Sequence, residues 1–229
     1  LRCFARCYGL RSYIVSAMVN TRDEVFLPTL ISCAAQGSLL DEEGVLESVY
    51  GLRKIGTEKA CVGLTSLLGA NDPEVRRAVG NEIAWFPGDH SPIELVAFLN
   101  SSNIETRCAA AHSLAGVRGD AGLTYLFALR SDPLWQIRKA VLQAFALWME
   151  RFGERKEMIT YIEDGTKEVN DSVRYEAYVT LWYDVKRKDT NLIERVRNDS
   201  CEKIRNLTAE FTRNLENESF REKVKHPSE

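Results

Sequence analysis

Apolar residues recur at intervals of three and four along most of the chain. In HSPIELVAFLN, residues 90–100, they stand at Ile93, Val96, Ala97 and Leu99, which is the spacing of one face of an α-helix. The same spacing predicts helices over residues 24–36, 57–69, 90–100, 120–130, 156–165 and 191–199. Because no segment shows a convincing alternation of apolar and polar positions, the sequence predicts an all-α protein.

A second set of helical segments lies between these and shares an arginine. The arginines follow one another at steps of 31, 31, 36 and 31 residues and are Arg76, Arg107, Arg138, Arg174 and Arg205. An apolar residue or a threonine precedes each arginine, and mostly small residues follow it three or four positions later. Linked positions that recur in five copies indicate an internal repeat.

Each repeat is a pair of helices, and a single pair is too small to cover its own apolar face. We therefore predict an α–α superhelix, a right-handed solenoid of about six helical hairpins, as one domain over residues 1–215. Residues 1–22 are expected to form an N-terminal capping unit, and the polar residues 216–229 to form a frayed C-terminal tail. The step of 36 residues predicts extra residues at 149–157, as a binding loop or a longer turn.

The stretch NDPEVRRAVG, residues 71–80, indicates how a repeat helix begins. Proline is tolerated in the first turn because the N–H that it lacks has no partner within the helix there. Asp72 and Asp132, each of which precedes a proline, are expected to cap the free amides of the helices that follow. We expect the repeated arginines to reach acidic or carbonyl groups of the adjacent unit and so to set the stacking register.

The pattern Asp-Pro-x-Val-Arg-x-Ala with a following A-x-x-L resembles the HEAT repeat, in the short variety of the phycobilisome lyase-like group. It is carried by residues 71–78, 104–115, 132–142, 172–181 and 203–210, and the resemblance covers residues 23–215. The resemblance implies the solenoid fold but leaves the function open, since this repeat serves many unrelated roles. Members of the lyase-like group attach or move bilin chromophores, usually as a pair of solenoid subunits.

Composition gives no sign of catalysis. The six cysteines include no CxxC pair, and His90, His112 and His226 are each followed by a residue other than glutamate, which argues against zinc and di-iron sites. There is also no phosphate-binding glycine motif. Trp148 and Trp182 are expected in the core. We therefore predict a non-catalytic protein without cofactor or metal.

Charge and localisation favour a cytoplasmic protein that binds other proteins. Thirty Lys and Arg residues against 33 Asp and Glu residues give a net charge of −3, so a surface built wholly for nucleic acid is not expected. No apolar run is long enough to cross a bilayer. Scattered cysteines are typical of a reducing cytosol, and we interpret most of the five N-x-S/T sequons as accidental.

The predicted function is binding of a partner protein through the concave face of the solenoid. In stacked hairpins the second helices line this face. We call each repeated arginine, or the equivalent position of the first repeat, the anchor of its repeat, and positions one, five and nine after each anchor should point outward. The predicted contact strip is Tyr50, Arg77, Asn81, Trp85, His112, Lys139, Gln143 and Tyr175. The alternatives are an immunity or antitoxin-like protein, which residues 173–196 resemble, a phycobilin lyase-like subunit, and a nucleic-acid surface formed by the arginines. Nucleic acid and membrane are not expected as partners.

Overall fold

The computed structural model describes residues 8–36, 42–86, 92–117, 119–187 and 189–225. Every regular element in these ranges is a helix, so the prediction of an all-α protein built from helical hairpins is confirmed. Contacts gather in two compact units, unit 1 over residues 1–132 and unit 2 over residues 133–229. The single domain over residues 1–215 stays a prediction.

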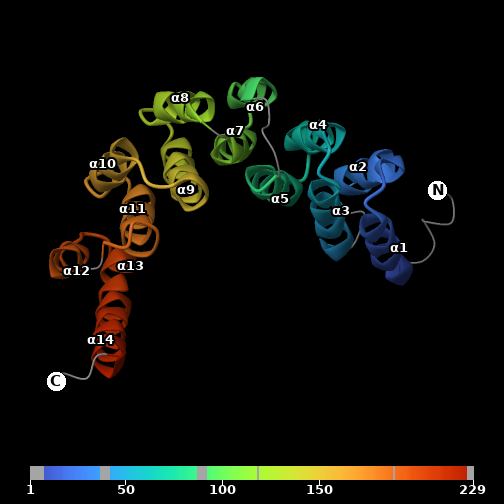
Figure 1. Cartoon of the computed structure of the whole chain (residues 1–229). Coiled ribbons are helices and arrows are strands. Elements are labelled where there is room, and N and C mark those ends of the chain that lie inside the picture. Colours follow the sequence, from blue (N-terminus) through green and yellow to red (C-terminus); the bar gives the residue numbers. More distant parts are fainter. Residues whose placement is uncertain (1–7, 37–41, 87–91, 118, 188, 226–229) are drawn as a thin grey trace. The chain divides into compact units, whose positions relative to one another are not determined.

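Unit 1 consists of two layers of helices. One layer contains α1 Tyr8–Thr21, α3 Glu42–Ile55, α5 Pro73–Ala84 and α7 Ile104–Ser113, each packed against the next (Figure 1). The other layer contains α2 Leu27–Ala35, α4 Glu58–Ser66, α6 Pro92–Leu99 and α8 Asp120–Leu129. Short 3₁₀ turns η1 Glu24–Phe26, η3 Leu67–Gly69 and η4 Leu114–Gly116 adjoin α2, α4 and α7.

Unit 2 repeats this arrangement. Its first layer contains α9 Trp135–Phe152, α11 Asp171–Tyr183, and α13 Glu202–Arg205, which is followed by α14 Leu207–Lys225. Helices α10 Lys156–Gly165 and α12 Thr190–Arg197 pair with α11 and α14, respectively. The helices expected over residues 156–165 and 191–199 are thus present with nearly the same bounds.

The apolar stripes of the helices form the core of each unit. In α5 the residues Val75, Val79 and Ile83 are fully buried one turn apart, as the helical period requires. In unit 2 the rings of Trp182 and Phe211 stack with centroids 4.1 Å apart, and both are fully buried. The prediction that Trp148 and Trp182 are core residues is confirmed, because both are buried.

Small residues allow neighbouring helices of unit 1 to approach closely. A Cβ atom on Gly80 of α5 would lie 3.2 Å from both the Cβ atom and the carbonyl oxygen of Ala109 on α7. Gly116 in η4 is tighter, since a Cβ atom there would lie 2.8 Å from the carbonyl oxygens of Ile83 and Ala84. The small residues of the sequence repeat therefore mark the places where one hairpin meets the next.

The repeated arginines occupy equivalent positions, as the sequence predicts. Each is the fourth residue of its helix, α5, α7, α9, α11 or α13; they are Arg76, Arg107, Arg138, Arg174 and Arg205. Helix α5 also begins as expected, with Pro73 in its first turn and the Asp72 side chain accepting from the Glu74 N–H at 2.9 Å.

Three expectations about element ends are wrong. Helix α9 begins at Trp135 with Leu134 at the N-cap position, so Asp132 lies two residues before the position of a cap. The extra residues of the long repeat form neither a loop nor a longer turn, because they lengthen α9 to 18 residues, against 12 in α5. The polar C-terminal stretch is helical as far as Lys225 rather than frayed.

Candidate functional site

The anchor arginines join each hairpin to its neighbour, and Arg174 shows how. Its Nη1 donates to the carbonyl oxygens of Glu168 and Val169 at 2.9 and 2.8 Å, in the loop that precedes its own helix. Its Nε and Nη2 donate to the two carboxylate oxygens of Asp199 in the next hairpin, both at 2.9 Å, and Nη2 also donates to Ser200 Oγ at 3.2 Å. All five N–H groups of Arg174 therefore have acceptors.

This pairing shifts the ionisation of both partners. Burial alone would raise the pKa of Asp199, but the hydrogen bonds from Arg174 and from the Cys201 backbone N–H outweigh burial and hold the pKa below its ordinary value. The same hydrogen bond, opposed by burial, raises the pKa of Arg174. The pair is therefore ionised at neutral pH.

Other anchors make the same kinds of contact. Arg138 donates to the Pro133 carbonyl at 3.2 Å and to both carboxylate oxygens of Glu168 at 2.8 and 3.0 Å. Arg76 donates to the carbonyls of Ala70 and Asn71 and pairs with Glu105 of α7. The expectation that the repeated arginines link adjacent hairpins is confirmed for Arg76, Arg138 and Arg174.

The two remaining anchors also turn toward their own loops. Arg107 Nη1 donates to the Ser101 carbonyl at 2.8 Å, and Arg205 Nη1 donates to the Asp199 and Ser200 carbonyls at 2.8 and 2.7 Å. Each of the five guanidinium groups thus donates to at least one backbone carbonyl of the loop before its own helix, so none of them is wholly available to a phosphate.

Five residues of the predicted strip belong to unit 1, and four of them are exposed. Arg77, Asn81 and Trp85 follow one another at intervals of four on α5 and its C-cap, on the side opposite the buried stripe. Tyr50 is exposed on the adjacent helix α3. The register that the anchors define therefore does turn these positions away from the core.

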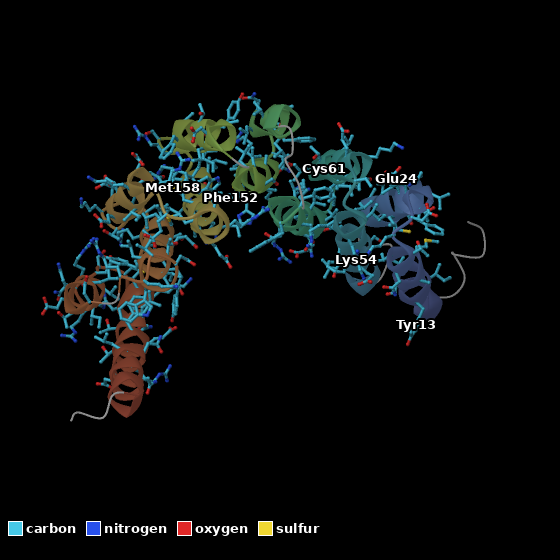
Figure 2. The ribbon with its side chains drawn as sticks, in the orientation of Figure 1. Tyr13, Glu24, Lys54, Cys61, Phe152 and Met158 are labelled. Carbon is cyan, nitrogen blue, oxygen red and sulfur yellow. The ribbon has the colours of Figure 1, made fainter. Side chains whose placement is uncertain are left out.

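Charged side chains surround the tyrosine of this group. The guanidinium carbon of Arg53 lies 5.1 Å from the centroid of the Tyr50 ring, and Lys54 Nζ lies 5.8 Å from it. Arg53 in turn pairs with Glu82 of α5, which ties α3 to α5 beside the exposed ring. Figure 2 shows Lys54 on α3 and Tyr13 on α1, on the side of unit 1 away from Cys61 on α4.

His112 on α7 is half-buried, and burial lowers its pKa below the ordinary value. The imidazole is therefore neutral at neutral pH and adds no charge to the surface of unit 1. It can donate or accept a hydrogen bond at the edge of this surface.

The other three strip residues belong to unit 2 and are half-buried in a polar network. Lys139 Nζ and Gln143 Nε2 of α9 lie 3.5 and 3.1 Å from the same oxygen, Oε2 of Glu176 on α11. Lys203 of α13 lies over the ring of Tyr175, with Nζ 4.4 Å from its centroid. The structure thus gives the two parts of the strip different characters, aromatic and exposed in unit 1, polar and internally paired in unit 2.

An open hollow of about 600 Å³ in unit 2 is not predicted by the sequence pattern. It is lined by loop and first-turn residues of three successive repeats, namely Pro133, Trp135, Arg138, Val169, Asn170, Asp171, Arg174, Ser200 and Cys201. A sequence signal was available for one lining residue, because Val169 is an apolar residue in an otherwise polar segment, five positions before an anchor.

In the ranges that the structure describes, no three His, Cys, Asp or Glu side chains are grouped so as to hold a metal ion. Among the same residues, no helix combines the length and the apolar character needed to span a bilayer. The predicted strip stays a prediction as a binding site.

Comparison with known proteins gives similarity to solved structures alone. No family model matches the chain, and no curated protein matches it. A chain in the complex of CpcE and CpcF of phycocyanin lyase from Nostoc sp. PCC7120 aligns over 89% of this chain and 81% of its own length, at 14% identity and a TM-score of 0.48. An engineered protein aligns over 83% of this chain and 96% of its own length, at 16% identity and a TM-score of 0.40. Neither similarity assigns a function to this chain.

Proposed function

We propose that this protein binds a partner protein through the outward face of α3 and α5 in unit 1, without catalysis. We call this surface the α3–α5 face and define it by Leu46, Tyr50, Arg77, Asn81 and Trp85. The observation that carries the proposal is the exposure of three large apolar side chains there, 41% for Leu46, 38% for Tyr50 and 43% for Trp85.

The composition of the face supports the proposal. Single exposed apolar residues are normal on a protein surface, but several of them on adjacent packed helices are typical of a binding surface. Tyr, Trp and Arg are also the residue types that contribute most to protein–protein affinity. Arg77 pairs with Glu74 of its own helix, Nε to Oε2 at 3.0 Å.

The rigidity of the face favours binding as well. Arg53 and Glu82 join α3 to α5, and Arg76 and Glu105 join α5 to α7. Because these contacts fix the helices before a partner arrives, little conformational entropy is lost on binding. Lys139, Gln143 and Tyr175 of unit 2, which the sequence analysis assigns to the same strip, stay a prediction as further contacts.

Site-specific cross-linking tests the proposal directly. A photoreactive phenylalanine analogue replaces Tyr50 in one sample and Val62 in another, and cross-linked partners from the native cell are identified by mass spectrometry. Val62 is a matched control because it is an apolar residue, 48% exposed, on α4 in the other layer of unit 1. We expect a specific partner from position 50 that is absent at position 62.

Substitution of the face supplies the second part of the test. Trp85→Ala and Leu46→Ala together should weaken capture of that same partner at least about tenfold, since burial of such anchors contributes roughly 2 kcal/mol each. Capture that is equal from both cross-linker positions, or unchanged in the double variant, contradicts the proposal. The identity of the partner also distinguishes an adaptor from an immunity protein, whose partner is a toxin, and from a lyase-like subunit, whose partner is a pigment protein.

A further inference from the structure

The hollow of unit 2 follows the edge where three successive repeats meet. Residues three to five positions before the anchors Arg138, Arg174 and Arg205 form its walls. The side chains of Arg138 and Arg174 form its floor and are only 16% and 12% exposed. Its volume of about 600 Å³ lies within the usual range for ligand sites.

The floor is not available to an anion. Arg174 has acceptors for all of its N–H groups, and Arg138 is paired through its Nε and Nη2 with both carboxylate oxygens of Glu168, while its Nη1 donates to the Pro133 carbonyl. An anionic ligand would have to displace a carboxylate that already binds in bidentate fashion, the strongest arrangement for arginine. The chemistry of the hollow is therefore set by its other polar groups.

Among those groups, Asp171 retains capacity to accept hydrogen bonds. The carboxylate is exposed and accepts from Ser172 Oγ and from Cys201 Sγ, each at 3.5 Å, which are long contacts. Asp171 interacts electrostatically with Arg174 but, in the part of the chain that the structure describes, forms no ion pair within 4.0 Å. A carboxylate has about four acceptor positions, so this group can still bind N–H donors from a ligand.

Two apolar side chains stand beside this carboxylate in the lining. Trp135 is 37% exposed and Val169 is 96% exposed, the highest value among the large apolar residues that the structure describes. A tryptophan face attracts cations more strongly than any other aromatic side chain. An exposed indole, an exposed valine and an available carboxylate together match a ligand with a cationic head and an apolar stem.

We propose that this hollow binds an arginine or lysine side chain from an extended segment of a partner protein. The cation lies between the Trp135 ring and the Asp171 carboxylate, and the apolar stem covers Val169. The site is independent of the α3–α5 face, so failure of one proposal leaves the other intact.

Nuclear magnetic resonance of the full chain tests the proposal with three capped tripeptides that differ only in their central residue. The probes are acetyl-Leu-Arg-Leu-amide, the same peptide with neutral citrulline, and the same peptide with glutamate. The Trp135 indole N–H signal is assigned from its loss in Trp135→Phe. We expect a saturable shift of this signal with the arginine peptide, and binding at least about tenfold weaker with citrulline, the factor expected for one charge-assisted hydrogen bond.

The matched variant is Asp171→Asn, with Asp120→Asn as its control. Asp171 and Asp120 are each the first residue of a helix, α11 and α8 respectively, so both substitutions remove one charge from a helix N-terminus. Asp171→Asn should weaken binding of the arginine peptide about tenfold, and Asp120→Asn should leave it unchanged. Circular dichroism confirms that each variant is folded.

Each other outcome overturns the proposal. Equal binding of the citrulline peptide means that the hollow is merely apolar, and preference for the glutamate peptide means that the floor arginines bind anions after all. Absence of any saturable shift at Trp135 means that the hollow does not bind such a segment. An effect of Asp120→Asn as large as that of Asp171→Asn means that the carboxylate in the hollow has no specific role.

Discussion

At the scale of single residues, a close approach of backbone to backbone in unit 1 depends on a missing side chain. A Cβ atom on Gly116 would lie 2.8 Å from two backbone carbonyl oxygens of the preceding repeat, and backbone cannot move aside as a flexible side chain can. We predict that Gly116→Ala lowers the free energy of unfolding by about 1–3 kcal/mol, the usual cost of overpacking. Denaturation in urea measures the change.

Gly69→Ala is the control for this substitution. Gly69 also ends a 3₁₀ turn, η3, but a Cβ atom there would first meet Phe98 Cε1 at 3.6 Å, an ordinary van der Waals contact. Gly69→Ala should therefore be neutral or slightly stabilising, because alanine restricts the unfolded chain. If both substitutions cost the same, close packing of Gly116 is not what holds the two repeats in register.

At the scale of elements, the contact between α11 and the loop before α13 predicts a dependence of stability on pH. The pKa of Asp199 is lower in the folded protein than in the unfolded chain, where it is about 3.9. The carboxylate therefore stabilises the fold fully above that value, and this contribution is lost as the pH falls through the depressed pKa. Arg174 stays protonated throughout this range.

We predict that Asp199→Asn lowers the free energy of unfolding by about 2 kcal/mol at pH 7, the value for a hydrogen bond to a charged group. The difference from the unchanged protein should shrink as the pH falls below about 4, because protonation then removes the charge from Asp199 itself. Urea denaturation at several pH values measures it. Asp164→Asn, which breaks an exposed pair with Lys167, should cost less than about 0.5 kcal/mol at any pH. A cost for Asp199→Asn that is constant down to pH 3 would show that the ion pair is not its source.

The elements themselves were largely predictable from sequence because their period is local. Helices over residues 57–69 and 120–130 needed only apolar spacing, and the anchor spacing placed Arg76 and Arg174 at equivalent positions. The length of α9 was not predictable in this way, since five extra residues can extend a helix or a loop with the same composition. Asp132 is likewise of a residue type that often caps helices, but the N-cap position of α9 is Leu134, and the sequence alone did not show this.

For the candidate site, the sequence predicted which helix positions are exposed but not which of them are paired with a neighbouring helix. Counting from the anchors identified the exposed positions of α3 and α5, because exposure there follows from the helical period. Whether such a position is free or paired depends on the neighbouring helix, and Glu176, which holds both Lys139 and Gln143, lies on α11 rather than α9. The hollow around Trp135 depends on three loops at once, which no single periodicity describes.

At the scale of the whole molecule, stacked hairpins imply that stability is local. Each helix pair contacts mainly the next, so the loss of one contact should loosen its own repeats and leave distant ones unchanged. Arg174 is suited to a test of this local stability, because its contacts join α11 to the hairpin of α12 and α13. We predict that Arg174→Met increases hydrogen exchange of backbone amides in α11 to α13 by about tenfold or more.

The same exchange measurement contains its own control. Amides of α3 and α5 belong to unit 1, whereas Arg174 belongs to unit 2, and the exchange of these amides should stay within about twofold of the unchanged protein. Mass spectrometry of peptic fragments resolves both regions in one experiment. An equal increase in α3 and α11 would mean that the chain opens as one cooperative unit, and the nearest-neighbour description of the repeats would then be wrong.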